Sequence, residues 1–280
     1  MKSEDFQYIA ALLKERSGLV LTSDKVYLLE SRLIPVARKR GLKGLDDLVD
    51  TIRKTKPEPL IADVTEAMTT NESFFFRDTK PFDLFRDNVL PHILSARPNK
   101  TFRVWCAAAS TGQEPYSLAM ILKEQSAKLA GWKYEIVGTD LSREVLERAK
   151  KGLYSQFEVQ RGLPIQMLVK YFEKKDDQWQ IKPEIRGMVQ YKELNLLHDL
   201  KALGNFDVVF CRNVLIYFDQ ATKGKILENI SKLMPNDGML FLGGAETVLG
   251  ISDKFKPLPG QRGVYCQANA PAGLGMAKAS

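Results

Sequence analysis

From Phe102 onward, the sequence alternates short apolar runs with helical stretches. FRVWCAAA precedes PYSLAMILKEQ, YEIVGTD precedes SREVLERAKKG, and FDVVFCRNVLIYF, KGKILENISKLM and GMLFLGG continue the pattern. Continuous apolar runs are typical of parallel strands buried on both faces, and each helix supplies the crossover to the next strand. This half of the chain is therefore predicted to form an α/β fold with a doubly wound, Rossmann-like sheet.

Two runs between Tyr154 and Leu194 do not fit this alternation. After the helical stretch PIQMLVKYF, the runs QWQIK and GMVQYKEL alternate apolar and polar residues. A period of two is typical of strands with one exposed face. We therefore predict that both runs belong to an antiparallel β-subdomain inserted at about residues 155–193.

The first seventy residues show helical periodicity and no strand pattern. Apolar residues repeat at helical spacing in two segments, first at Phe6, Ile9 and Leu13, then at Leu29 and Leu33,. Residues 56–59, with two prolines, are predicted to form a loop. The predicted organisation is a helical domain over 1–69, a linker over 70–92, the sheet domain over 93–267, and a disordered tail, poor in core residues, over 268–280.

The composition is that of an ordinary globular protein, with 44% hydrophobic and 27% charged residues,. The three cysteines, Cys106, Cys211 and Cys266, lie far apart without metal-ligand spacing, so we expect neither disulfides nor a metal site,. No signal peptide and no apolar stretch approaching the roughly 18 residues of a membrane span are visible. These features predict a soluble, cytoplasmic protein.

Basic residues exceed acidic ones, giving a formal charge of +7 and a pI near 9.1. Such a charge favours an acidic partner, which could be nucleic acid, anionic lipid or an acidic protein surface. Five basic residues gather on the second helical segment, Lys25 and the four residues Arg32, Arg38, Lys39 and Arg40. They form either a solvated helix face or a docking surface for an acidic partner.

The stretch after the first predicted strand, residues 107–112, consists almost entirely of very small side chains. In open α/β sheets ligands bind outside the carboxyl ends of the strands, and small residues there let the backbone approach a ligand closely. The stretch matches neither the GxGxxG pattern of dinucleotide-binding folds nor a phosphate-binding loop with Lys-Ser/Thr,. A cofactor other than a dinucleotide is therefore indicated.

Two acidic residues narrow the choice of cofactor. Glu114, at the start of the next helix, would repel a pyrophosphate and suits a cation. Asp140 ends the second strand, where an acidic residue typically binds ribose hydroxyls. S-adenosylmethionine combines an adenosine with a sulfonium and an ammonium group, and satisfies both carboxylates. In the alternative interpretation, Glu114 only stabilises the helix dipole and Asp140 only caps the following helix.

Several motifs together resemble one enzyme family: TTNESFFFRD, CAAASTGQEPYS, GTDLS, LNLL, FCRNVLIYFD and GGAE. In order and spacing they are similar to the CheR-type glutamate O-methyltransferases of chemotaxis receptors. The resemblance implies a cytoplasmic enzyme that transfers a methyl group from S-adenosylmethionine, leaving S-adenosylhomocysteine, to glutamates on the helical cytoplasmic region of chemoreceptors. It implies the fold as well, a methyltransferase sheet with a helical N-terminal domain that docks the receptor.

Carried over to this sequence, the family's cofactor contacts fall on Asn71, Ser73, Arg77, Glu114, Asp140, Asn195, Leu196, Arg212 and Asn213. Ser73 stands where family members commonly have threonine, and it keeps the hydroxyl. Tyr217 either lines the acceptor pocket and orients the incoming carboxylate, or is simply a core residue.

The chemistry of carboxylate methylation agrees with the residues available. A glutamate is already ionised at pH 7, so positioning and electrostatics suffice and no strong base is needed. The chain has two histidines, His92 and His198, and no pattern of a nucleophilic triad,.

Two other functions stay open. A nucleic-acid methyltransferase would use the basic charge and the aromatic run of Phe74, Phe75 and Phe76, but the Asn/Asp-Pro-Pro-aromatic tetrad of amino-methylating enzymes is replaced by NVLI. A non-catalytic S-adenosylmethionine-binding regulator would keep Glu114 and Asp140 without an acceptor pocket.

Some members of the family bind a pentapeptide at the receptor's C-terminus as an extra strand of the inserted β-subdomain. Those members carry a glycine-containing insertion at a hairpin where this chain has EKKDD, without glycine. The sequence therefore predicts an enzyme that does not depend on this tether.

Overall fold

The computed structural model describes residues 1–271. The chain divides into two compact units, the first comprising residues 1–70 with the short segment 217–222, and the second comprising 71–216 and the residues from 223 onward. No helix within residues 1–271 has both the length and the apolar character needed to cross a membrane.

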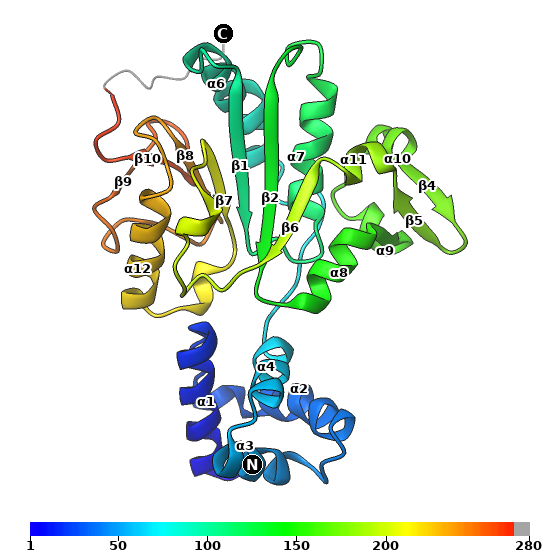
Figure 1. Cartoon of the computed structure of the whole chain (residues 1–280), viewed down its shortest axis with the longest axis vertical. Helices are drawn as coiled ribbons and strands as arrows, with labels where there is room; N and C mark the ends of the chain where they lie inside the picture. Colours follow the sequence, from blue (N-terminus) through cyan, green and yellow to red (C-terminus); the bar gives the residue numbers. More distant parts are fainter. Residues whose placement is uncertain (272–280) are drawn as a thin grey trace. The chain divides into compact units, whose positions relative to one another are not determined.

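The first unit is helical, as the sequence predicts (Figure 1). Residues 1–70 form α1 (Ser3–Ser17), η1 (Ser23–Lys25), α2 (Val26–Lys39), α3 (Leu45–Thr55) and α4 (Glu58–Ala67). Helix α1 ends at Gly18, whose φ of 77° lets its N–H bond to the carbonyl of Lys14,. The prediction of a loop over 56–59 is wrong beyond Pro57, because α4 begins at Glu58 with Pro59 in its first turn, where a missing N–H costs nothing,.

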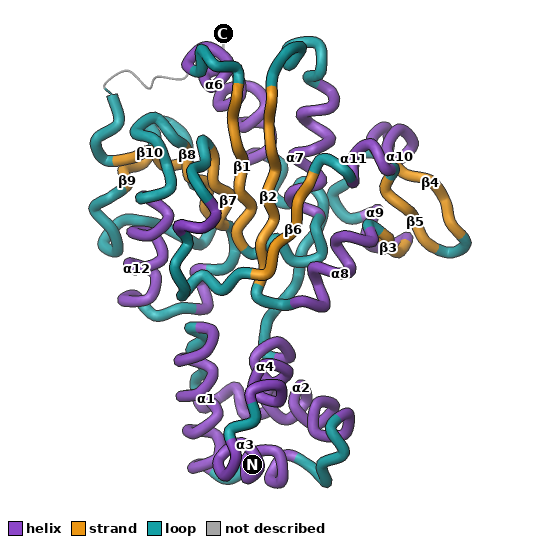
Figure 2. The backbone as a smooth tube through the Cα atoms, in the orientation of Figure 1, coloured by secondary structure: helices purple, strands orange, loops and turns teal. Residues whose placement is uncertain are grey.

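The second unit is built on a seven-stranded sheet with the order β6-β2-β1-β7-β8-β10-β9 (Figures 1 and 2). The first five strands in this order are parallel, and β10 and β9 are antiparallel to their neighbours. The strands are β1 (Thr101–Ala107), β2 (Lys133–Asp140), β6 (Val189–Glu193), β7 (Val208–Cys211), β8 (Met239–Leu242), β9 (Phe255–Pro257) and β10 (Val264–Gln267).

Helices connect these strands and cover the sheet. They are α5 (Lys80–Leu84), the π-helical turn η2 (Phe85–Val89), α6 (Leu90–Ala96), α7 (Gln113–Glu124), α8 (Arg143–Lys151), η3 (Lys201–Leu203), η4 (Leu215–Tyr217) and α12 (Gln220–Ser231). Helix α8 is capped at its N-terminus by Ser142, whose hydroxyl accepts a bond from the N–H of Val145, and at its C-terminus by Gly152 with φ 60°,. The fold is therefore the doubly wound α/β class predicted from the alternation.

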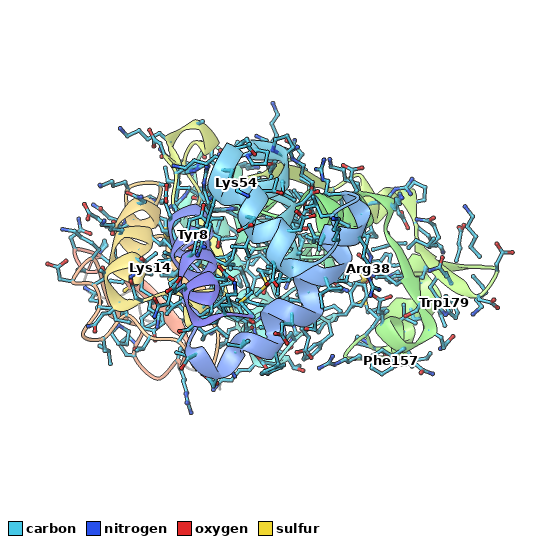
Figure 3. All side chains as sticks on the ribbon, turned by 90° about the horizontal axis from the view of Figure 1, so that it is seen from below. Tyr8, Lys14, Arg38, Lys54, Phe157 and Trp179 are labelled. Atoms are coloured by element: carbon cyan, nitrogen blue, oxygen red, sulfur yellow. The ribbon has the colours of Figure 1, made fainter. Side chains whose placement is uncertain are left out.

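A second, antiparallel sheet has the strand order β3-β5-β4 (Figure 2). Its elements are β3 (Leu153–Ser155), α9 (Gln156–Gln160), α10 (Ile165–Tyr171), β4 (Phe172–Lys175), β5 (Gln178–Ile181) and α11 (Pro183–Arg186). Trp179 of β5 donates a bond to Gln156, the neighbour of the exposed Phe157, so both aromatic residues lie at one end of this element (Figure 3). We call residues 153–186 the β-subdomain.

The predicted membership of the β-subdomain was wrong at its second run. GMVQYKEL contains β6, which pairs in parallel with β2 at the edge of the large sheet, with Gly138 opposite Tyr191. An edge strand has one partly exposed side, so its alternating pattern resembles that of an antiparallel strand. The missing third strand, β3, lies in a run of only three residues that carries no periodic signal.

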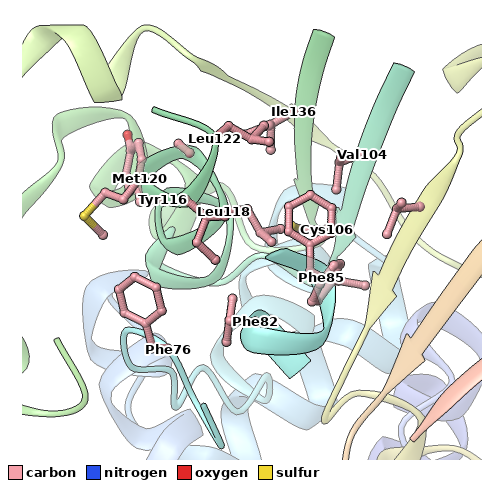
Figure 4. Packing of buried hydrophobic residues seen from close by; sticks show 14 of the residues in the cluster. Phe76, Phe82, Phe85, Val104, Cys106, Tyr116, Leu118, Met120, Leu122 and Ile136 are labelled. Atoms are coloured by element: carbon pink, nitrogen blue, oxygen red, sulfur yellow. The ribbon is translucent and has the colours of Figure 1, made fainter. Parts of the chain in front are cut away.

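The core of the second unit contains residues that precede the first strand. Phe76 and Phe82 pack with Tyr116 and Leu118 of α7 and with Cys106 of β1 (Figure 4). The Phe82 ring also stacks on Phe210 of β7, with centroids 5.9 Å apart. The segment predicted as a linker therefore belongs to the second unit and contributes side chains to its hydrophobic core.

The C-terminal strands β9 and β10 were not predicted from the sequence. The predicted disordered tail begins one residue after β10, and its first residues are ordered: the N–H of Ala268 bonds to the carbonyl of Lys254, and Ala270 is buried. The rest of that prediction, over 272–280, lies outside the described residues.

Candidate active site

The strand order creates one topological switch point in the large sheet. From β1 the chain proceeds outward through β2 to β6, and then returns to β7 and β8 on the other side of β1. The loops leaving β1 and β7 therefore diverge at the carboxyl ends of two neighbouring strands. In open α/β sheets this crevice is where ligands bind.

The loop after β1, residues 108–112, turns through three residues with positive φ: Ala108 at 60°, Ser110 at 51° and Gly112 at 94°. A Cβ on Gly112 would lie 2.6 Å from the hydroxyl oxygen of Tyr191, so only glycine fits there,. The Ser110 hydroxyl donates a 2.8 Å bond to the carbonyl of Asn71. This bond ties the loop to the segment that precedes the sheet.

Asp140, at the end of β2, joins three strand ends. Its side chain accepts bonds from the N–H of Ser110, at 2.8 Å, and of Ser142, at 3.0 Å, and its carbonyl accepts one from the N–H of Leu194, at 2.9 Å. The N-cap of α8 is Ser142. Asp140 is thus a buried residue whose carboxylate links the exits of β1 and β2 and whose backbone carbonyl bonds to the exit of β6; it is not the N-cap itself.

Arg212, at the end of β7, lies on the other side of the switch point. Its guanidinium, with the side chain only 1% exposed, contacts Glu114 at 2.8 Å and Asp78 at 2.6 Å, and it also donates to the carbonyl of Arg77 at 3.0 Å. Burial raises the pKa of Glu114, and the charge of Arg212 opposes that rise,. The pairing joins α7, β7 and the segment before the sheet in one polar network.

The other predicted cofactor residues border the same strand ends. Asn195 follows β6, and its side-chain oxygen accepts a bond from Leu197 N–H at 3.0 Å, while Leu196 is buried. The Arg77 guanidinium donates to the carbonyl of Glu72 at 3.0 Å. Asn71 contacts the β1 loop through its carbonyl, and Ser73 and Asn213 are half-buried.

Tyr217 closes the turn η4 and belongs with residues 217–222 to the first unit. It is half-buried. Its role in an acceptor pocket stays a prediction.

The four basic residues predicted to dock a partner differ in their side-chain contacts: two of them bond to other residues of the same unit, and two do not in the part of the chain that the structure describes. Arg32 donates to the carbonyls of Met68 and Thr69, at 2.9 and 2.8 Å, after the end of α4. Arg40 pairs with Asp63 at 2.6 Å. Arg38 and Lys39 are exposed and make no ion pair within residues 1–271 (Figure 3 labels Arg38). The last two are the better docking candidates.

Three residues important to this region were missed by sequence reasoning. The hydroxyl of Tyr154 donates to the carbonyl of Thr111, Tyr191 packs on Gly112 and Gly138, and Glu246 accepts bonds from the loop after β7. The tyrosines gave no signal, because an aromatic residue in a strand reads as core. Glu246 was visible only as part of GGAE.

The residues at the switch point fit S-adenosylmethionine. Asp140 offers a carboxylate suited to ribose hydroxyls, and Glu114 offers one suited to an ammonium group. The Nε of Arg212 is buried and has no hydrogen-bond partner within residues 1–271. A buried donor without a partner is costly, so a ligand acceptor at this place would be favourable.

Comparison with known proteins identifies the family. Residues 4–69 match the CheR methyltransferase all-alpha domain, and residues 71–264 match the CheR methyltransferase SAM-binding domain. The chain is 39% identical to the chemotaxis protein methyltransferase Cher2 of Pseudomonas putida, over 94% of this chain and 98% of that protein. It is 41% identical to chemotaxis protein methyltransferase 1 of Pseudomonas aeruginosa, over 94% and 97% of the two chains. The chain belongs to the CheR methyltransferase family.

Proposed function

We propose that this protein transfers a methyl group from S-adenosylmethionine to the carboxylates of glutamate side chains in bacterial chemoreceptors, as an enzyme of chemotaxis. The observation that carries the proposal is the pair of carboxylates, Glu114 and Asp140, at the strand ends of a domain that matches the family's SAM-binding model. The substrates are the cytoplasmic methylation helices, so the enzyme acts in the cytoplasm. Nucleic acid is not a substrate.

Asp140 would hold the ribose hydroxyls, because carboxylate oxygens can each accept more than one hydrogen bond. Asn195 and Leu196 would border the adenine, next to the end of β2. Asn71, Ser73 and Arg77 would close the site from the segment before the sheet. These roles agree with the bonds that already link that segment to the β1 loop.

Glu114 would face the positive amino-acid end of the cofactor, with Arg212 and Asn213 beside it. Arg212 already pairs with Glu114, so it would hold the carboxylate in place while the carboxylate attracts a cation. The bound cofactor supplies an electrophilic sulfonium methyl. An acceptor glutamate, ionised at pH 7, can attack without a general base or a metal, and Tyr217 would orient it.

The reaction is tested by incubating the protein with methyl-labelled S-adenosylmethionine and a chemoreceptor cytoplasmic fragment. Methyl esters of glutamate release labelled methanol on mild alkaline hydrolysis, whereas N-methyl groups do not. The matched control is the same fragment with its methylated glutamates replaced by glutamine, which should incorporate no label. Incorporation into nucleic acid, or label that resists alkali, would contradict the proposal.

The cofactor site is tested separately with Arg77→Ala and a matched variant, Arg86→Ala. Arg86 lies in η2 and pairs with Asp83 and Asp87. Arg77→Ala should lower the methylation rate and leave the fold intact, while Arg86→Ala should not change the rate. A native rate in Arg77→Ala would remove that residue from the site.

A further inference from the structure

The side chain of Glu246 accepts four backbone N–H bonds from two segments that are far apart in the sequence. Its Oε1 accepts from Val214 at 2.9 Å and Leu215 at 2.7 Å. Its Oε2 accepts from Asn213 at 2.8 Å and from Gly243 at 2.6 Å. Glu246 is 9% exposed, so these bonds form away from bulk water.

This arrangement uses the full capacity of a carboxylate, which has about four lone-pair positions. Three of the four donors are successive N–H groups of one loop, the arrangement that forms an anion-binding nest. Bonds from N–H groups to an ionised carboxylate are about twice as strong as neutral ones. The loop after β7 therefore directs three of its N–H groups to the carboxylate of Glu246.

The backbone of that loop has a conformation that requires such support. Asn213 has a φ of 58°, in the left-handed region that non-glycine residues rarely adopt,. The opposing turn is equally tight, because a Cβ on Gly243 would lie 2.7 Å from both Asn213 Nδ2 and Glu246 Oε2. The loop geometry thus depends on the Glu246 charge and on the absence of a side chain at position 243.

We propose that Glu246 is a positioning residue that holds the loop from Arg212 to Leu215 in the geometry required for cofactor binding. It acts through the backbone, and its side chain spans from the turn after β8 to the loop after β7. This inference rests on the proposed cofactor contacts of Arg212 and Asn213. The GGAE segment would therefore support the cofactor site through Glu246, although Glu246 itself does not contact the cofactor.

The discriminating variant is Glu246→Gln, which keeps the size of the side chain and replaces one oxygen by an NH₂ group. That group would face two N–H donors, so two of the four bonds are lost and the loop relaxes. We expect the Kd for S-adenosylhomocysteine, measured by calorimetry, and the KM for S-adenosylmethionine to rise about tenfold. The KM for the receptor fragment should not change.

Asp207→Asn is the matched control. Asp207 is a half-buried carboxylate that also accepts a backbone bond, from Arg103 N–H at 2.8 Å, and a side-chain bond from Arg97 at 2.6 Å. It precedes β7, at the opposite end of that strand from the loop. Asp207→Asn should lower the melting temperature without changing the Kd for S-adenosylhomocysteine.

Gly243→Ala tests the same geometry with the Glu246 charge retained, and should also raise the Kd. A native Kd in folded Glu246→Gln, or an equal rise in Asp207→Asn, would overturn the positioning role. Failure of both Glu246→Gln and Gly243→Ala to fold would show that Glu246 supports only stability. Asp140→Ala, measured in the same experiment, distinguishes the positioning role from the proposed cofactor site. If Asp140→Ala also binds S-adenosylhomocysteine normally, the proposed cofactor site is wrong. If Asp140→Ala loses binding while the Glu246 and Gly243 variants keep it, only the positioning role is wrong.

Discussion

The hydroxyl of Tyr154, in the β-subdomain, donates a 2.8 Å hydrogen bond to the carbonyl of Thr111, in the loop after β1. Both residues are buried, and the Tyr154 ring packs edge-on against Phe75 with centroids 5.0 Å apart. The β-subdomain therefore touches the cofactor loop directly through one polar contact. Burial raises the pKa of Tyr154 well above its usual value, so the phenol remains a donor at physiological pH.

Tyr154→Phe removes this donor and leaves a buried carbonyl without its partner. The loss costs about 1 kcal/mol of stability and loosens the loop. We expect the Kd for S-adenosylhomocysteine to rise about fivefold in calorimetry. Tyr171→Phe is the control, because that buried hydroxyl of the same subdomain donates to Glu124 and not to the loop. Equal Kd values for the two variants would show that the Tyr154 bond has no role in binding.

Asp140→Ala should abolish cofactor binding while the protein stays folded. The bonds to the N–H groups of Ser110 and Ser142 are also lost, so the unfolding free energy should fall by about 1–2 kcal/mol,. Ser142→Ala provides a stability control, since loss of this N-cap costs about 1 kcal/mol without removing the carboxylate,. Unchanged cofactor affinity in folded Asp140→Ala would exclude Asp140 from the site.

The sequence was sufficient to predict four strands of the large sheet, β1, β2, β7 and β8, because these apolar runs alternate with helical segments,. Glu114 and Asp140 were also predictable, since each occupies a defined position after a strand. What could not be predicted depends on tertiary contacts. The pairing of Arg212 with Glu114 joins residues 98 positions apart. Three of the four bonds to Glu246 come from the loop after β7, and that loop meets Glu246 only because β7 and β8 are adjacent in the sheet.

Short elements formed the second limit to prediction. The three-residue strands β3 and β9 are too brief for a period to emerge,. The role of Arg32 was also hidden, because a basic residue on a helix reads the same whether it is solvated or bonded to carbonyls. Exposure in the folded chain, not composition, distinguishes Arg32 from Arg38.

The stability of the sheet unit should depend on pH through Asp237. Arg97 pairs with it at 2.7 Å and lowers the pKa of this carboxyl. A lowered folded pKa means that the stabilisation is present above the unfolded value, about 3.9, and is lost as the pH falls through the folded pKa. In urea denaturation, Asp237→Asn should be less stable than the native protein at pH 7, and the difference should disappear in strong acid.

A variant of Asp253, which is 92% exposed at its side chain, serves as the control for this pH dependence. Asp253→Asn should follow the native stability curve at every pH. If Asp237→Asn retains the full acid dependence of the native protein, another carboxyl is responsible.

Methylation should not depend on the receptor's C-terminal pentapeptide. β4 is an outer strand with three exposed residues, so an edge for strand addition exists. The β4–β5 turn, however, consists of Asp176 and Asp177 and lacks the glycine-containing insertion. We expect receptors with and without the terminal pentapeptide to be methylated at nearly equal rates. Saturable binding of an isolated pentapeptide in calorimetry would refute this expectation.

Receptor docking is predicted to use the exposed charges at the end of α2. Arg38→Glu with Lys39→Glu should raise the KM for the receptor fragment and leave the Kd for S-adenosylhomocysteine unchanged. Attraction between a cationic helix and glutamate-rich helices is screened over about 8 Å at physiological salt, so the effect should shrink as salt rises. The charge-matched control is Lys43→Glu with Lys54→Glu, two exposed lysines of the same unit outside α2.

Reversal of Arg32 should behave differently from reversal of Arg38 and Lys39. Because Arg32 bonds to the carbonyls of Met68 and Thr69, its loss leaves part-buried acceptors unpaired and costs about 1–3 kcal/mol,. Arg32→Glu should therefore lower the melting temperature at every salt concentration, an effect that the Arg38 and Lys39 variant should not share. If the double variant keeps the native KM and its salt dependence, α2 is only a solvated face and the receptor docks elsewhere.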